Sequence, residues 1–151
     1  MKEIWAVVHR EREALSEDMH SVNTQQWSTL SLCPGWDVHD ILAHLTDDAT
    51  TTRLSFVARM LAARFDFDRV NATGVARERC TDPAQTLARF DHVRTRTTSA
   101  PAPLVTRLVE VFVHGEDVRG PAIALLLAAS GRPLRAGELT GHGTSLLTTA
   151  N

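Results

Sequence analysis

The chain has 151 residues, of which 43% are hydrophobic and 23% are charged, and its formal net charge at pH 7 is -2. This length suits one principal domain, and the near-neutral charge gives no electrostatic reason to expect nucleic acid or an anionic membrane as partner. The N-terminus lacks the basic, apolar leader of a secreted protein, and the longest apolar run, residues 122–129, is far shorter than the ~20 residues that span a bilayer. We therefore expect a cytoplasmic monomer or homodimer that acts on small molecules.

The chain contains two cysteines, Cys33 and Cys80, and their spacing matches no metal motif. Two free thiols in a reducing compartment are the simplest interpretation, and a bridge between them is the alternative. Neither cysteine lies beside a residue that would activate it, so we expect both to serve packing.

The N-terminal segment carries apolar residues at steps of three and four from Ile4 to Val22, which predicts an amphipathic helix. A polar segment follows, in which Pro34 and Gly35 mark a turn. Trp27 and Trp36 in this segment are large apolar anchors, and we expect both to be buried and to hold the segment against the core.

A second helix is predicted to begin at Asp37, whose carboxylate can cap the first turn, with Asp40 favouring the positive end of the helix dipole. An apolar stripe that starts at Val38 extends this helix to about Phe65. The spacing therefore predicts one long helix here.

Residues 66–80 show no regular period and are predicted to be irregular. A third helix is expected to start with Asp82 as its cap and Pro83 as its first residue, and to end near Thr98. A fourth helix, over about residues 103–119, is apolar around more than half of its circumference, so we expect it to be largely buried. Four helices without alternating strands predict an all-α fold, a four-helix bundle.

The fourth helix carries Glu110, His114 and Asp117 on one sector that is otherwise apolar. An ionised carboxylate and an imidazole are costly to bury without compensation, and a divalent metal between them supplies it. His44, on the flank of the second helix, is the natural third ligand, and two histidines with one glutamate suit zinc with an open fourth position.

Simpler interpretations of these residues remain open at this level. A Glu/His pair four residues apart is common on helix surfaces, and a histidine at the edge of an apolar stripe is often only a packed residue. No general acid or base can be identified, so the catalytic residues are unknown. Asp48, Arg53 and Asp117 are candidates to orient a ligand or substrate.

Two segments together resemble a known family. "QQWSTLSLCPGWDVHDILAHL" and "LVEVFVHGEDVRG" are similar to the mycothiol-dependent maleylpyruvate isomerase family, within the DinB-like metal-binding four-helix bundles found widely in actinobacteria. The resemblance covers about residues 4–119, and the positions that match in spacing are Trp27, Cys33, Gly35, Trp36, Val38, Asp40, His44, Glu110, His114 and Asp117.

The resemblance implies both a metal and a thiol cosubstrate. In the family, the residues that correspond to His44, Glu110 and His114 bind a divalent metal, typically zinc, and the open position receives the thiolate of a low-molecular-weight thiol such as mycothiol. A coordinating thiol is deprotonated and becomes a nucleophile at neutral pH. The expected activity is S-transfer or thiol-assisted isomerisation of a small-molecule substrate. The alternative is a metal- or thiol-binding bundle that has a regulatory role and no catalytic activity.

The resemblance also implies a division of the chain. Residues 1–119 are expected to form the metal-binding bundle, and residues 120–151 resemble the end of a small, sterol-carrier-like α/β appendage. The strand-bearing segment that the family has between Gly120 and Pro121 is absent from this sequence.

Overall fold

The computed structural model describes residues 2–119, and within this range the chain is all-α, as the sequence predicts. The expected appendage over 120–151 lies outside the described residues. The elements in chain order are α1 (Lys2–His20), the 3-10 helix η1 (Gln26–Ser28), α2 (Val38–Thr50), α3 (Arg53–Ala62), α4 (Phe67–Glu78), α5 (Pro83–Val93) and α6 (Thr106–Arg119).

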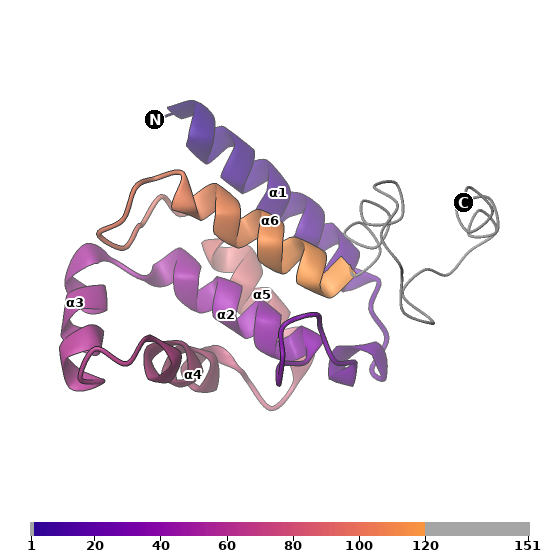
Figure 1. Ribbon diagram of the computed structural model, residues 1–151. Coiled ribbons are helices and arrows are strands. Elements are labelled where there is room, and N and C mark those ends of the chain that lie inside the picture. Colours follow the sequence, from indigo (N-terminus) through magenta and orange to yellow (C-terminus); the bar gives the residue numbers. More distant parts are fainter. Residues whose placement is uncertain (1, 120–151) are drawn as a thin grey trace, which may run out of the picture.

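The helices α1, α2, α5 and α6 form a four-helix bundle, with α4 beside α2 and α3 at one end (Figure 1). Nearly every side chain of α2 is buried, so this helix is the centre of the fold. Along the bundle, α2 and α6 run in opposite directions (Figure 1). The apolar core of the bundle contains a cluster of buried residues: Leu15, Met19, Trp27, Val38, Ile41, Leu42, Leu45, Leu87 and Phe90.

The start of α2 is as predicted. The Asp37 carboxylate accepts a hydrogen bond from the Asp40 backbone N–H, and the Asp40 side chain accepts one from the Asp37 N–H, which completes a capping box. Arg79, just after α4, donates to both carboxylates at 2.6–3.0 Å. One guanidinium thus ties the end of α4 to the first turn of α2.

The predicted continuation of this helix to Phe65 is wrong, because α2 ends at Thr50. Thr51 and Thr52 both have extended backbones, and the Thr51 hydroxyl donates to the carbonyl of Asp47. Thr52 then caps α3 in a second capping box with Ser55. The apolar period continues across this break, so the period alone does not reveal where α2 ends. The spacing of Thr52 and Ser55, which is that of a capping box, is the local signal for a new helix.

The segment 66–80, predicted to be irregular, contains α4, which Asp66 caps by accepting a hydrogen bond from the Arg69 N–H. Gly74 in this helix lies against Asp47 of α2, where a Cβ atom would overlap the carboxylate. The lack of a side chain at Gly74 therefore allows α4 to lie this close to α2.

The last two helices follow the prediction in part: α5 begins where it is predicted to, and α6 begins at Thr106, three residues late, but ends at Arg119 as predicted. Asp82 caps α5 and Pro83 is its first residue, but α5 ends at Val93 and not near Thr98. The expectation that 103–119 is largely buried is also wrong, because α6 packs mainly against α1 and α2 and leaves its outer side uncovered by any described helix. The apolar residues on that side are 45–55% exposed; they are Val105, Val109, Phe112 and Val113.

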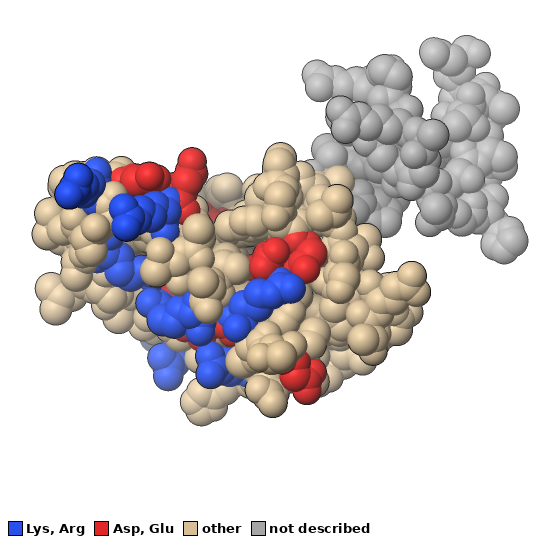
Figure 2. Space-filling view, turned by 90° about the horizontal axis from the view of Figure 1, so that it is seen from below, with Lys and Arg blue, Asp and Glu red and all other residues tan. Residues whose placement is uncertain are grey.

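The side of the molecule formed by α3 and α4 is rich in arginine. Residues 53–79 contain Arg53, Arg59, Arg64, Arg69, Arg77 and Arg79, against three acidic residues. Figure 2 shows blue groups gathered over this face. Two of these arginines, Arg59 and Arg77, share the buried carboxylate of Asp47, which balances one of their two charges. Among residues 2–119, no helix is both long and apolar enough to cross a membrane.

Candidate metal centre

Three of the residues selected from the sequence meet between α2 and α6. The Nε2 atoms of His44 and His114 lie 3.6 Å and 3.4 Å from Oε2 of Glu110. One donor atom from each residue lies within 4.8 Å of the other two. The antiparallel course of α2 and α6 brings the middle of each helix to this point (Figure 1). The structure therefore places a three-donor cluster where the sequence predicts one.

The cluster lies at the edge of the core. His44 is buried, whereas the side chains of His114 and Glu110 are 16% and 33% exposed. The donors are thus held by packing on one side and open toward solvent on the other. This partial exposure leaves room for an ion to enter and for a further ligand to approach it.

The electrostatics of the cluster favour an ionised Glu110. The contacts from His114 and then His44 hold the pKa of the Glu110 carboxyl far below its usual range, against the effect of burial. Burial alone would lower the pKa of His114, but Glu110 and Asp117 outweigh it and raise that pKa. An ionised Glu110 thus lies against His114, whose protonated form it stabilises.

The Nδ1 atoms of the two histidines, which do not face Glu110, have different surroundings. Nδ1 of His114 lies 2.9 Å from Oδ2 of Asp117, which directs Nε2 toward Glu110. This carboxylate–histidine contact is typical of metal-binding histidines. Nδ1 of His44 is buried without a hydrogen-bond partner among the described residues, and its ring packs against Trp36 at a centroid distance of 5.1 Å.

Trp36 covers one side of the cluster. Its indole also lies 6.4 Å from the His114 ring, in a stacked arrangement. The expectation that both tryptophans are buried is confirmed for Trp27, which is 7% exposed, but Trp36 is only half-buried. The sequence indicated an anchor at Trp36; its contact with the two histidines was not foreseen.

The other two orienting candidates do not hold the histidines. Asp48 lines the small pocket beside His44 and Glu110, but its carboxylate forms ion pairs with Arg12 and Arg107. Arg53 is exposed at the first residue of α3. The sequence analysis did not predict the two arginines that bind Asp48. Arg12 could have been recognised, because it is a charged residue between Val8 and Leu15 on the buried face of its helix.

A small pocket of about 50 Å³ reaches the cluster. Its wall is lined by His44, Asp47, Asp48, Thr51, Phe56, Arg59, Phe67, Val70, Asn71, Ala100, Arg107 and Glu110. Such a volume holds one or two water molecules. It provides an approach to the Glu110 side of the cluster.

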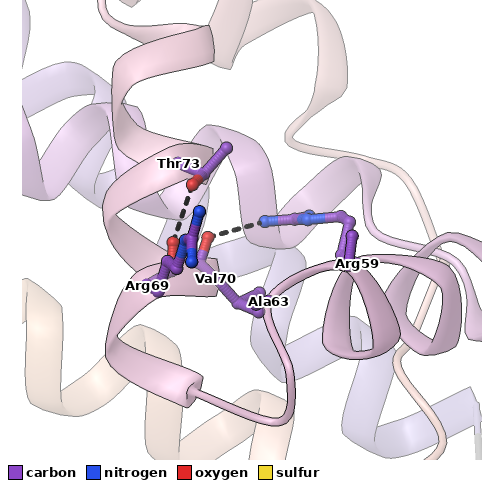
Figure 3. A pocket seen from close by; sticks show the side chains of 6 residues that line it. Arg59, Ala63, Arg69, Val70 and Thr73 are labelled. Atoms are coloured by element: carbon purple, nitrogen blue, oxygen red, sulfur yellow. Dashed lines mark hydrogen bonds between the residues drawn. The ribbon is translucent and has the colours of Figure 1, made fainter.

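A larger pocket, of about 220 Å³, lies between α3 and α4 and is separate from the cluster (Figure 3). Arg59 crosses it and donates to the carbonyl of Val70, while Thr73 donates to the carbonyl of Arg69 (Figure 3). The residues that line it include no acid, histidine or cysteine. This pocket therefore offers no group for metal binding or acid–base chemistry.

Both cysteines are free thiols, as predicted. Burial, followed by the charge of Asp117, raises the pKa of the Cys33 thiol. Cys33 is therefore a poor nucleophile at neutral pH, in agreement with a packing role in the loop between α1 and α2.

The family described as the mycothiol maleylpyruvate isomerase N-terminal domain matches residues 8–105, well over half of the chain. The matched range includes His44 and ends just before α6, so Glu110 and His114 lie beyond it. No curated protein and no solved structure matches the chain significantly.

Proposed function

Because the chain belongs to the mycothiol maleylpyruvate isomerase N-terminal domain family, we propose that it is an enzyme with a zinc ion at His44, Glu110 and His114. It would use a low-molecular-weight thiol, mycothiol, for S-transfer or thiol-assisted isomerisation of a small-molecule electrophile. The convergence of the three donors across α2 and α6 carries this proposal. The metal-binding unit is the bundle of residues 1–119.

The chemistry of the donors fits zinc. Two imidazole nitrogens and one carboxylate oxygen are the ligand set of many catalytic zinc sites, which keep a fourth position for water or substrate. The partial exposure of Glu110 and His114 supports such an open position. Zinc bound here lowers the pKa of a coordinating thiol, which supplies a thiolate at neutral pH.

The protein's own residues have supporting roles in this proposal. Asp117 holds the His114 ring so that Nε2 faces the other two donors. Trp36 shields the two imidazoles from water on one side. The thiol and the electrophile approach from the Glu110 side, where the small pocket lies.

The second candidate is a metal- or thiol-binding bundle that has no catalytic activity and serves regulation. The observation that favours it is the size of the pocket at the cluster, about 50 Å³, which is too small for a thiol cosubstrate as it stands. Catalysis would then require either a wider opening or a ligand bound across the surface.

Metal analysis and a thiol-conjugation assay separate these candidates. Purified protein should contain one zinc per chain, and His114→Ala should lose both zinc and turnover, because Glu110 and His44 alone make a weak site. Turnover should require added mycothiol. Zinc binding without any thiol chemistry would favour the regulatory alternative, and protein that binds no divalent metal would overturn the proposed site.

The double variant Cys33→Ser, Cys80→Ser is the control for the source of the thiol. It should keep its zinc and most of its activity, because neither cysteine belongs to the cluster. A folded, zinc-loaded double variant without activity would contradict the use of an external thiol.

A further inference from the structure

A second group of charged side chains lies one helical turn from the candidate metal centre. Asp48 follows His44 by four residues on α2, and Arg107 precedes Glu110 by three residues on α6. The carboxylate of Asp48 binds the guanidinium of Arg107 across the two helices. The same two helices are thus joined by the cluster of donors and by this ion pair.

The ion pair is unusually well buried for charged groups. Arg107 is 5% exposed, and the Asp48 side chain is 11% exposed. Arg12 of α1, 1% exposed, also binds Asp48, at 3.5 Å, and donates to backbone carbonyls just after α5. Burial, followed by the charge of Arg107, lowers the pKa of Arg12 to about 10. Charges this deep are costly unless their geometry is fixed, so the group resists sliding of α6 along α2.

Sliding is the movement that would damage the metal centre. One residue of helix rise is about 1.5 Å, and metal ligands tolerate errors of only a few tenths of an ångström. Among the apolar side chains of α6, Val111 is buried, whereas Val109, Phe112 and Val113 are 45–55% exposed. Apolar packing of α6 on the bundle therefore supplies few contacts that select one register. A directional ion pair can select it.

We propose that Arg107 is a positioning residue for the metal centre, which acts through Asp48 to fix the register of α6 on α2 at which Glu110 meets His44. This inference rests on the proposed metal site. Arg107 is not itself a ligand; its charge interacts with the Glu110 carboxylate, and its proposed effect on the ion comes through the placement of α6.

The chain contains a second group of the same kind, which joins α2 to different helices. Asp47, next to Asp48, also binds two arginines, Arg59 of α3 and Arg77 of α4. In both groups one carboxylate of α2 holds two guanidiniums, but the ion pairs of Asp47 join α2 to α3 and α4, and neither of them involves a residue of α6. Removing one arginine from either group leaves its aspartate paired with the other.

The test compares Arg107→Met with Arg77→Met in the full chain. Zinc affinity is measured by competition with a chromophoric chelator, and the cobalt-substituted protein reports ligand geometry by its visible absorption. Arg107→Met should weaken zinc binding about 10- to 100-fold, the range found when residues that orient metal ligands are lost, and should change the cobalt spectrum. Arg77→Met should change neither.

Asp48→Glu serves as a second variant, because it keeps the charge and lengthens the side chain by one methylene. It too should weaken zinc binding, while Arg107→Lys should restore most of the affinity lost in Arg107→Met. Normal zinc affinity in folded Arg107→Met or Asp48→Glu would overturn this inference and leave the proposed function standing. Zinc binding that is weakened equally in Arg77→Met and Arg107→Met would have the same consequence. Wild-type protein that binds no zinc would overturn both.

Discussion

The indole of Trp36 lies against both histidines of the candidate metal centre, which makes it an optical reporter of that site. Cobalt quenches nearby fluorophores, so titration of metal-free protein with cobalt should reduce tryptophan fluorescence until one equivalent is bound. Trp36→Phe keeps an aromatic ring at the position and should abolish most of the quenching.

The remaining tryptophans provide the control for this titration. Trp27 packs against His39 and Trp5 against His9, and neither of these ring contacts involves His44 or His114. If quenching persists unchanged in Trp36→Phe, the cobalt is bound elsewhere, and the assignment of His44 and His114 to one ion is contradicted.

At His44, two features of the sequence, its motif and its helix face, both predict a site, and the structure places its ring beside Glu110 and His114. Glu110 and His114 follow from one-turn spacing on a single helix. Arg107 could not be assigned in the same way, because its role depends on which helix faces α6, and the sequence does not specify the pairing of helices. Asp48 was selected as an orienting residue, but its arginine partners were not.

At the scale of elements, the cap of α2 depends on charge. Burial raises the pKa of Asp37, but the hydrogen bond and charge of Arg79 outweigh it and hold that pKa below its ordinary value. A depressed folded-state pKa stabilises the protein above the unfolded-state value of about 3.9, and the stabilisation is lost as pH falls through the folded-state pKa.

Asp37→Asn isolates this charge, because asparagine caps helices about as well as aspartate. The variant should be less stable than the wild type by about 1 kcal/mol at pH 7. The difference should shrink as the pH falls below about 4, as measured by urea unfolding. A difference that does not depend on pH would show that the Arg79 pair contributes nothing through charge.

At Gly74 of α4, helix packing and helix propensity predict opposite effects of an alanine substitution on stability. Alanine favours a helix over glycine by about 1 kcal/mol, but a Cβ atom here would overlap the Asp47 carboxylate, which Arg59 and Arg77 hold in place. Gly74→Ala should therefore destabilise the protein by about 1–3 kcal/mol, as measured by thermal unfolding. A rise in melting temperature would mean that α4 can move away from α2 at little cost.

The same elements show where local signals suffice. The helix starts at Asp37 and Asp82 are set by capping chemistry within four residues, and both were predicted correctly. The break at Thr51 was missed because the apolar period continues through it. The helix α4 was missed because only Val70, Gly74 and Val75 are buried, too few to show a period.

For the molecule as a whole, α2 is the organising element. Its consecutive residues Asp47 and Asp48 bind arginines on different sides, so one joins α3 and α4 to the bundle while the other joins α1 and α6. The candidate metal centre lies one turn from the second group. The ion pairs of Asp47 thus attach α3 and α4 to the bundle, whereas the ion pairs of Asp48 align the two helices that carry the candidate metal centre.

A chain that ends at Arg119 tests whether this bundle is a complete unit. We expect it to keep its helical circular-dichroism signal and one zinc per chain, because the core and the three donors all lie within residues 2–119. Light scattering after gel filtration would detect aggregation through the exposed apolar side of α6. If the shortened chain aggregates where the full chain does not, and Phe112→Gln restores its solubility, the boundary at 119 is wrong.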